Sequence, residues 1–125
     1  MNLTNVIQEF GARHGQPGAS LAAGASTQVS VDGITLSFQA SDTELLAVTV
    51  FAAPFLEPAR LLAMLQSLDA RRLRPDGIPI QLASKGSASE LKLVAALRWP
   101  AATVSAAQID QGAGALHRFR KEWLS

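Results

Sequence analysis

The sequence predicts one α+β domain, with three helices and an antiparallel sheet of about five strands in the order α-β-β-β-α-β-β-α. Apolar residues at three- and four-residue steps predict the helices, and stretches of alternating apolar and polar residues predict the strands. The Asp32-Gly33 pair between two alternating runs predicts a tight hairpin, because both central positions of a type I′ turn need positive φ. No repeat or linker interrupts the 125 residues, so 1–125 is expected to be a single domain.

The first half of the chain is predicted to form one helix and three strands. Helical spacing predicts a helix over Leu3–Phe10, which Gly15 stops. The hairpin follows, and the β-branched run Leu45–Phe51 predicts a third strand. Alternation along the second hairpin strand means that only one of its faces is apolar, and the sequence leaves open which face meets the helices. The apolar residues of the hairpin are Val29, Val31, Ile34, Leu36 and Phe38.

The middle helix is predicted to begin at Pro58, since proline at the first helical position loses no hydrogen bond. Its apolar residues cover more than one stripe, which indicates either deep burial or packing against a partner. The two readings stay open on the residues alone. The apolar residues concerned are Leu61, Leu62, Met64, Leu65 and Leu68.

The last part of the chain is predicted to form two strands and a helix. Ile78–Leu82 alternates, and its Pro79 indicates an edge strand. Leu91–Trp99 predicts the final strand. A helix is expected to start at a capping box formed by Ser105 and Gln108, and to depend on packing because its two glycines each cost about 1 kcal/mol relative to alanine. The glycines are Gly112 and Gly114, and the packing residues are Ile109, Ala113, Leu116, Phe119 or Arg120, and Trp123.

The charge of the chain gives no support for nucleic acid or membrane as a partner. The net charge is +1, and the one basic cluster, Arg71, Arg72 and Arg74, has no aromatic side chains beside it for stacking. The N-terminus lacks the pattern of a secretory signal, so a cytoplasmic location is expected. Only 17% of the residues are charged, which favours some apolar surface that is exposed or covered by a partner.

No motif supports catalysis, a metal or a nucleotide. The chain has no cysteine, and neither His14 nor His117 has further ligands at metal-binding spacing. Ser84-Lys85-Gly86-Ser87 lacks the upstream glycine of a phosphate loop. We therefore expect a protein that is not an enzyme and binds no cofactor.

The ordered set of elements resembles the small class I type III secretion chaperones, which escort effector proteins in bacteria. The resemblance runs over nearly the whole chain and lies in patterns of leucine and turn residues. The residues that carry the resemblance are Leu3–Phe10 with Gly15, Val29–Phe38, Glu44–Phe51 with Pro54-Phe55-Leu56, Leu61-Leu62 with Met64-Leu65, Gly77–Leu82, Leu91–Trp99, and Phe119 with Trp123.

The resemblance implies a homodimer that binds an extended segment near the N-terminus of an effector, without ATP. The dimer interface would use the middle helix and the strand after it, through Leu61, Leu62, Leu65, Leu68 and Ile80. The effector segment would lie on the first helix and the hairpin, through Val6, Phe10, Val29, Val31, Ile34, Leu36 and Phe38.

The chain departs from the family pattern in charge. Its pI is near 8.3, whereas many members are acidic, and Leu21–Ser26 lacks acidic residues. These departures leave open a chaperone that serves several effectors. They also leave open a small regulatory or assembly module of the same shape that binds a folded secretion-system partner.

Overall fold

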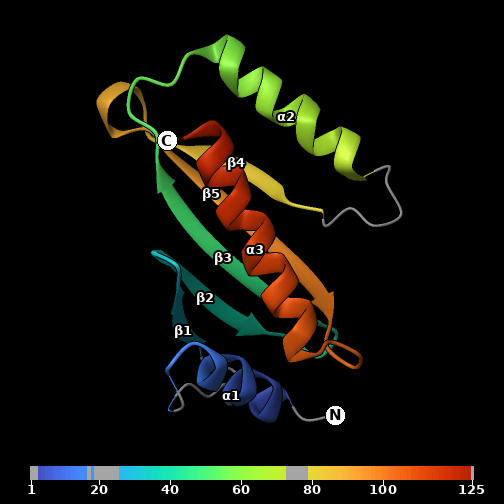
Figure 1. Ribbon diagram of the computed structural model, residues 1–125. Helices are drawn as coiled ribbons and strands as arrows, with labels where there is room; N and C mark the ends of the chain where they lie inside the picture. The colour runs from blue at the N-terminus through green and yellow to red at the C-terminus, as the bar shows by residue number, and fades with distance from the viewer. Residues whose placement is uncertain (1–2, 17, 19–25, 73–78, 125) are drawn as a thin grey trace.

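The computed structural model of the protein describes residues 3–16, 18, 26–72 and 79–124, and only the backbone of 69–72. Within these residues the chain forms three α-helices and five strands in the predicted order, which confirms the α+β fold class (Figure 1). The elements are α1 (Leu3–Arg13), β1 (Ser26–Val31), β2 (Ile34–Ala40), β3 (Glu44–Ala52), α2 (Pro58–Arg72), β4 (Gln81–Lys85), the 3₁₀ helix η1 (Ala88–Glu90), β5 (Lys92–Pro100) and α3 (Ala106–Trp123).

The five strands form one antiparallel sheet in the order β1-β2-β3-β5-β4. The predicted hairpin is confirmed: Asp32 and Gly33 have φ values of 51° and 82°, as a type I′ turn requires. The predicted edge strand is confirmed as an edge, but its position was wrong. The ladder between β4 and β5 starts at Gln81, whereas Ile80 is buried just before it and Ile78 lies outside the described residues.

Helices α1 and α3 cover one face of the sheet and bury its apolar side chains. The ring of Phe10 on α1 meets the edge of Phe38 on β2, with centroids 5.7 Å apart, and Phe51 on β3 lies 6.3 Å from Phe119 on α3. These pairs belong to a single apolar core shared by the sheet and the helices. Of the two residues left open for α3, Phe119 is therefore the core residue, and Arg120 is exposed.

This packing corrects the predicted effector surface. The seven residues expected to hold an effector segment are each no more than 6% exposed. They are buried because α1 lies against the same face of the hairpin that carries its apolar side chains. The seven are Val6, Phe10, Val29, Val31, Ile34, Leu36 and Phe38.

Helix α2 lies at the border of the molecule, beyond the C-terminal end of α3 (Figure 1). Arg60 joins the two helices: its guanidinium lies 5.2 Å from the centroid of the Trp123 ring and donates two hydrogen bonds to the Trp123 carbonyl, at 2.9 and 3.2 Å. Met64 and Leu68 are buried. Helix α2 therefore uses one side to reach the core.

Only some of the five residues expected at a dimer interface lie on the surface of the structure. Leu62 is 56% exposed and Leu65 is 39% exposed, while Leu61 is half-buried. Leu68 and Ile80 are core residues at 4% and 3%, and this corrects their place in the predicted interface. None of the helices in the described residues has both the length and the apolar character needed to cross a membrane.

Candidate functional site

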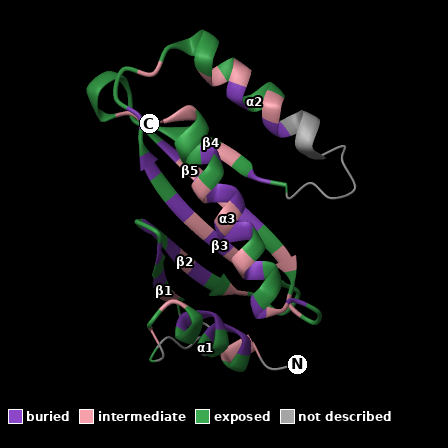
Figure 2. Ribbon diagram, viewed as in Figure 1, coloured by how far each residue is buried: buried purple, intermediate pink, exposed green. Residues whose placement is uncertain are grey.

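The second face of the sheet carries an apolar patch that no helix of the described chain covers. Burial alternates along β3 and β5, so residues at even positions turn away from the core (Figure 2). The cross-strand register places Val48 beside Ala96 and Val50 beside Val94, and Ala83 of β4 follows next to Val94. Val50 is 54% exposed. We call this surface the open face; its apolar residues are Leu46, Val48, Val50, Ala52, Ala83, Val94 and Ala96.

Polar residues frame the open face on three sides. At one end, Arg98 donates hydrogen bonds to Glu44 at 3.1 Å and to Gln81 at 2.8 Å. At the other end, Lys85 and Lys92 are direct cross-strand partners, and both are exposed. The β1–β2 side carries only uncharged polar residues: Gln28, Ser30, Thr35, Ser37 and Gln39. An apolar centre with a polar rim is the usual composition of a protein-binding surface.

A cleft of about 450 Å³ opens between β2 and β3. The ladder between these strands runs from the Ala40–Leu45 pair to the Ser37–Val48 pair and stops there. Both strands continue past this point, β2 back to Ile34 and β3 on to Ala52, while each remains paired with its other neighbour. The cleft is therefore a split inside the sheet, lined by Gln28, Gly33, Ile34, Thr35, Ser37, Val48, Thr49, Val50, Phe51, Ala52, Arg120 and Leu124.

The register shows which backbone groups point into this cleft. Alternate residues of an antiparallel strand direct their N–H and C=O groups to opposite neighbours. The Ser30 N–H and C=O are bonded by the side chain of Gln16, at 3.0 and 2.6 Å, so they point away from β2. Thr35, the cross-strand partner of Ser30, therefore directs its backbone groups towards β3. On β3, the Ala53 N–H bonds to Leu91 before β5, so even-numbered residues such as Val50 face β2.

One charged side chain lines the cleft among the described residues. Arg120 of α3 reaches the wide end of the split, where its Nη1 donates a hydrogen bond to the Gly33 carbonyl at 3.3 Å. It forms no ion pair with any described carboxylate. The sequence analysis named Arg120 only as an alternative to Phe119 in the packing of the helix, because helical periodicity gives no signal for a binding role.

Other exposed apolar residues lie apart from the open face. Phe55, in the loop between β3 and α2, is 73% exposed and has a φ of 58°, an uncommon backbone conformation for a bulky residue. Its N–H bonds to the Ala88 carbonyl at 2.9 Å, which holds this loop against η1. Besides Val50, Phe55 and the two exposed leucines of α2 are the large apolar residues that the described chain leaves exposed.

The described residues bring together no set of three or more side chains suited to a metal. His14 contacts the single carboxylate of Asp110, at 2.6 Å. His117 is a half-buried helix residue whose Nδ1 has no hydrogen-bond partner in the described chain. Of the predicted basic cluster, Arg74 and the side chains of Arg71 and Arg72 lie outside the described residues.

Comparisons with known proteins leave the family open. No protein-family model matches the sequence, and no curated protein is significantly similar to it. Among solved structures, the chain is similar to the crystal structure of YbjN from E. coli, with a TM-score of 0.47 and 14% sequence identity. The similar region covers 97% of this chain and 84% of that one. The likeness is too distant to bear on function.

Proposed function

We propose that the protein is a type III secretion chaperone that binds an extended N-terminal segment of an effector and keeps that segment competent for secretion. The observation that carries the proposal is the open face. Its centre is apolar and its rim is polar, and Val50 at the centre is 54% exposed. An uncovered apolar surface of this kind in a small domain marks a site of protein contact. We place the protein in the bacterial cytoplasm, where the effector would be bound before export.

The proposed mechanism needs no chemistry from the protein. Binding would remove the apolar side chains of the effector segment from water and so prevent their aggregation. The residues of the open face are mostly valine and alanine, which makes the surface shallow. A shallow surface gains little from any one side chain, so the contact should be long and its energy spread over many positions.

A homodimer is part of the same proposal. The exposed leucines of α2, Leu62 and Leu65, lie on the side of the helix that does not reach the core. A second copy packed on α2 would cover them. The open face contains neither of these leucines, so the dimer contact and the effector contact would use different residues.

The short side chains of the open face also suit contact with a folded partner, and this favours the second candidate function. A small regulatory or assembly module would use the same residues to bind the surface of a folded secretion-system protein. The two functions differ in the state of the bound partner. An extended segment binds as an isolated peptide, whereas a folded surface is lost when the partner is cut into peptides.

The test uses one substitution on the open face and one matched control. Val94→Glu places a charge in the middle of the patch, and Ala102→Glu places the same charge in an exposed loop away from it. We expect wild type and Ala102→Glu to bind a partner captured from the source bacterium, and Val94→Glu to lose it. The same loss should occur with a synthetic peptide from the N-terminal region of that partner. Binding that survives Val94→Glu would overturn the use of this face, and binding only to the folded partner would favour the second function.

A further inference from the structure

We infer that the β2–β3 cleft takes up an extended segment of the partner polypeptide as an inserted strand, with an acidic side chain of that segment bound to Arg120. The inference rests on the proposed function, because it gives the bound segment a place and a chemical requirement. The open face accounts for apolar contact alone. The cleft adds main-chain pairing and a charge.

The main-chain groups of Thr35 and Val50 form the first part of this site. Continuing the ladder beyond Ser37–Val48 would pair these two residues, but the strands have separated there. Each therefore presents one N–H and one C=O to the space between them. These are the groups that an added strand uses for its affinity, whatever its sequence. Both residues are exposed, so the segment can enter from the open face.

The outer edge of β1 offers no comparable position at the same level of the sheet. There the side-chain amide of Gln16 accepts from the Ser30 N–H and donates to the Ser30 carbonyl. It imitates the backbone of a neighbouring strand and closes the edge to an added chain. The split between β2 and β3 has no such cover in the described chain.

Arg120 supplies the chemical requirement. A guanidinium has five N–H donors, and Arg120 uses Nη1 for the Gly33 carbonyl. A carboxylate is the matching acceptor, because it pairs with arginine through charge-assisted hydrogen bonds. Lys92 adds positive charge near the wide end of the split, since it pairs with Ala52 across β3 and β5. The acidic residue of the turn, Asp32, does not line the cleft.

The position of Arg120 favours an acidic side chain over a free carboxyl terminus. Arg120 binds Gly33 at the wide end of the split, whereas Ser37 and Val48 close the narrow end. A chain that ended in the cleft would have its terminal carboxylate at the narrow end, away from the guanidinium. An internal Asp or Glu at the entrance meets Arg120 directly.

The test measures binding of a defined probe by fluorescence anisotropy. The probe is a labelled seven-residue peptide of alternating valine and threonine with a central glutamate, blocked at both ends. The comparison peptide has glutamine in place of the glutamate. We expect wild type to bind the glutamate peptide about ten-fold more tightly, as a charge-assisted hydrogen bond provides. Equal binding of the two peptides, or no binding of either, overturns the inference.

Substitutions of two arginines distinguish an effect of the charge at the cleft from an effect of positive charge elsewhere on the protein. Arg120→Gln should remove the preference for glutamate, and Arg120→Lys should keep most of it. Arg118→Gln is the matched control, because it makes the same change on the exposed surface of α3 without lining the cleft. A preference that survives Arg120→Gln, or disappears equally in Arg118→Gln, contradicts the assignment.

A proline substitution tests the main-chain part. Val50→Pro removes an N–H that points into the cleft and leaves the ladder with β5 intact, because proline is tolerated where the N–H of a strand is unpaired. We expect it to abolish binding of both peptides with an unchanged circular dichroism spectrum. Ser30→Pro, which removes the N–H that the Gln16 side chain binds at the outer edge of β1, should leave peptide binding in place. If Val50→Pro does not fold, the arginine series decides alone.

The two proposals fail separately. Loss of partner binding in Val94→Glu with normal probe binding supports the open face, since Val94 does not line the cleft. If no captured partner depends on Val94 but the probe binds through Arg120, the proposed function fails and the cleft remains a peptide site. If the partner depends on Val94 but is unaffected by Arg120→Gln and Val50→Pro, only the cleft inference fails.

Discussion

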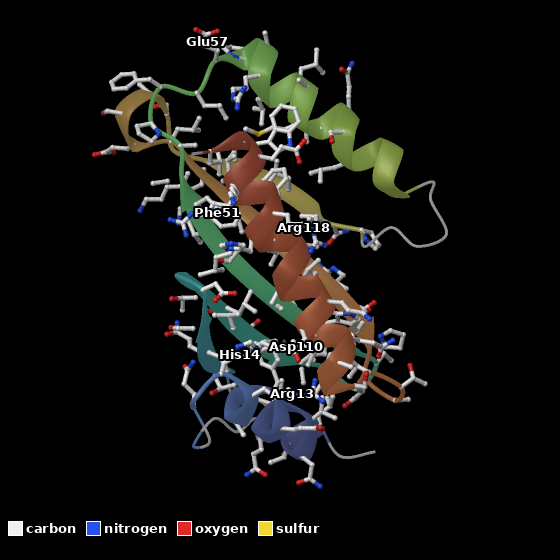
Figure 3. All side chains as sticks on the ribbon, viewed as in Figure 1. Arg13, His14, Phe51, Glu57, Asp110 and Arg118 are labelled. Atoms are coloured by element: carbon white, nitrogen blue, oxygen red, sulfur yellow. The ribbon has the colours of Figure 1, made fainter. Side chains whose placement is uncertain are left out.

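His14 and Asp110 lie 96 residues apart in the sequence, yet the imidazole Nε2 of His14 is 2.6 Å from Oδ1 of Asp110. The second carboxylate oxygen, Oδ2, accepts a hydrogen bond from the neighbouring Arg13 at 2.7 Å (Figure 3). Arg13 is the last residue of α1 and His14 follows it, while Asp110 lies in the first turns of α3. The carboxylate therefore fastens α1 to α3, and α1 in turn covers the apolar face of the hairpin.

This arrangement predicts that Asp110→Asn destabilises the protein in a pH-dependent way. Partial burial raises the pKa of Asp110, but the hydrogen bonds from Arg13 and His14 outweigh it, so the pKa lies below the ordinary value of 3.8. A carboxyl group with a lowered pKa in the folded state stabilises it above the unfolded pKa, and loses this effect as the pH falls through the folded pKa. We expect a loss of about 1 kcal/mol at pH 7, shrinking from about pH 5 downwards. Urea unfolding at a series of pH values measures it.

Asp42→Asn provides the control for this titration, because Asp42 is an exposed residue of the β2–β3 turn. It should leave the unfolding free energy nearly unchanged at every pH. A difference between wild type and Asp110→Asn that stays constant down to pH values well below 3.8 would contradict the role of the ionised carboxylate.

The exposed leucines of α2 predict a homodimer that can be split without unfolding. Leu62 and Leu65 are exposed, so Leu62→Asp and Leu65→Asp should give folded monomers. Leu68 is 4% exposed, and Leu68→Asp should unfold the protein because it buries an unpaired charge. Light scattering at a protein concentration of about 10 to 100 micromolar gives the mass of the particle in solution, and thermal melting shows whether each variant is folded. A monomeric wild type would refute the dimer.

The local structure could be predicted from the sequence because it depends on neighbouring residues. The type I′ turn at Asp32-Gly33 formed as expected. So did the capping box, in which the Ser105 hydroxyl accepts from the Gln108 N–H at 3.2 Å and the Gln108 side chain accepts from the Ser105 N–H at 2.9 Å. In each case the residue types permit few backbone conformations, so short sequences were enough.

The binding surface could not be predicted, because it depends on which face of the sheet the helices cover. Periodicity identified Ile34, Leu36 and Phe38 as one apolar face, and the same pattern suits a core face or a contact surface. The central strands gave a less regular signal, since β3 is apolar on both sides. Val50, which remains exposed there, has the same sequence pattern as a buried valine. The sequence does not indicate the split between β2 and β3, because a residue pattern typical of a strand continues in both past Ser37 and Val48.

The two glycines of α3 should respond in opposite directions to alanine. A Cβ on Gly112 would lie 2.7 Å from Cζ2 of Trp99 and 2.8 Å from Cδ1 of Leu97, so this glycine lets the helix approach the sheet. Overpacking of this kind costs about 1–3 kcal/mol, which exceeds the gain of about 1 kcal/mol in helix propensity. Gly112→Ala should therefore lower the free energy of unfolding.

Gly114→Ala is the matched control on the same helix. A Cβ there would meet only Nη1 of Arg118, at 3.4 Å, the mobile end of an exposed side chain. The helix propensity of alanine should then dominate and raise stability by up to about 1 kcal/mol. Chemical denaturation of both variants measures the two effects, and a gain in stability from Gly112→Ala would contradict the close packing of α3 on β5.

The cross-strand pair of Lys85 and Lys92 predicts a charge effect that a double-mutant cycle can isolate. Like charges directly opposite each other on an antiparallel pair are unfavourable, by less than about 1 kcal/mol. Lys85→Glu or Lys92→Glu should each raise the free energy of unfolding, since each creates an opposite-charge pair. The double variant restores a like-charge pair and should return to the stability of wild type. Both gains should shrink in high salt, because the two side chains are exposed to solvent. Additive effects of the two single changes would show that the lysines do not interact. If the interaction is present, the repulsion between the two lysines lowers the free energy of unfolding at the border of the open face.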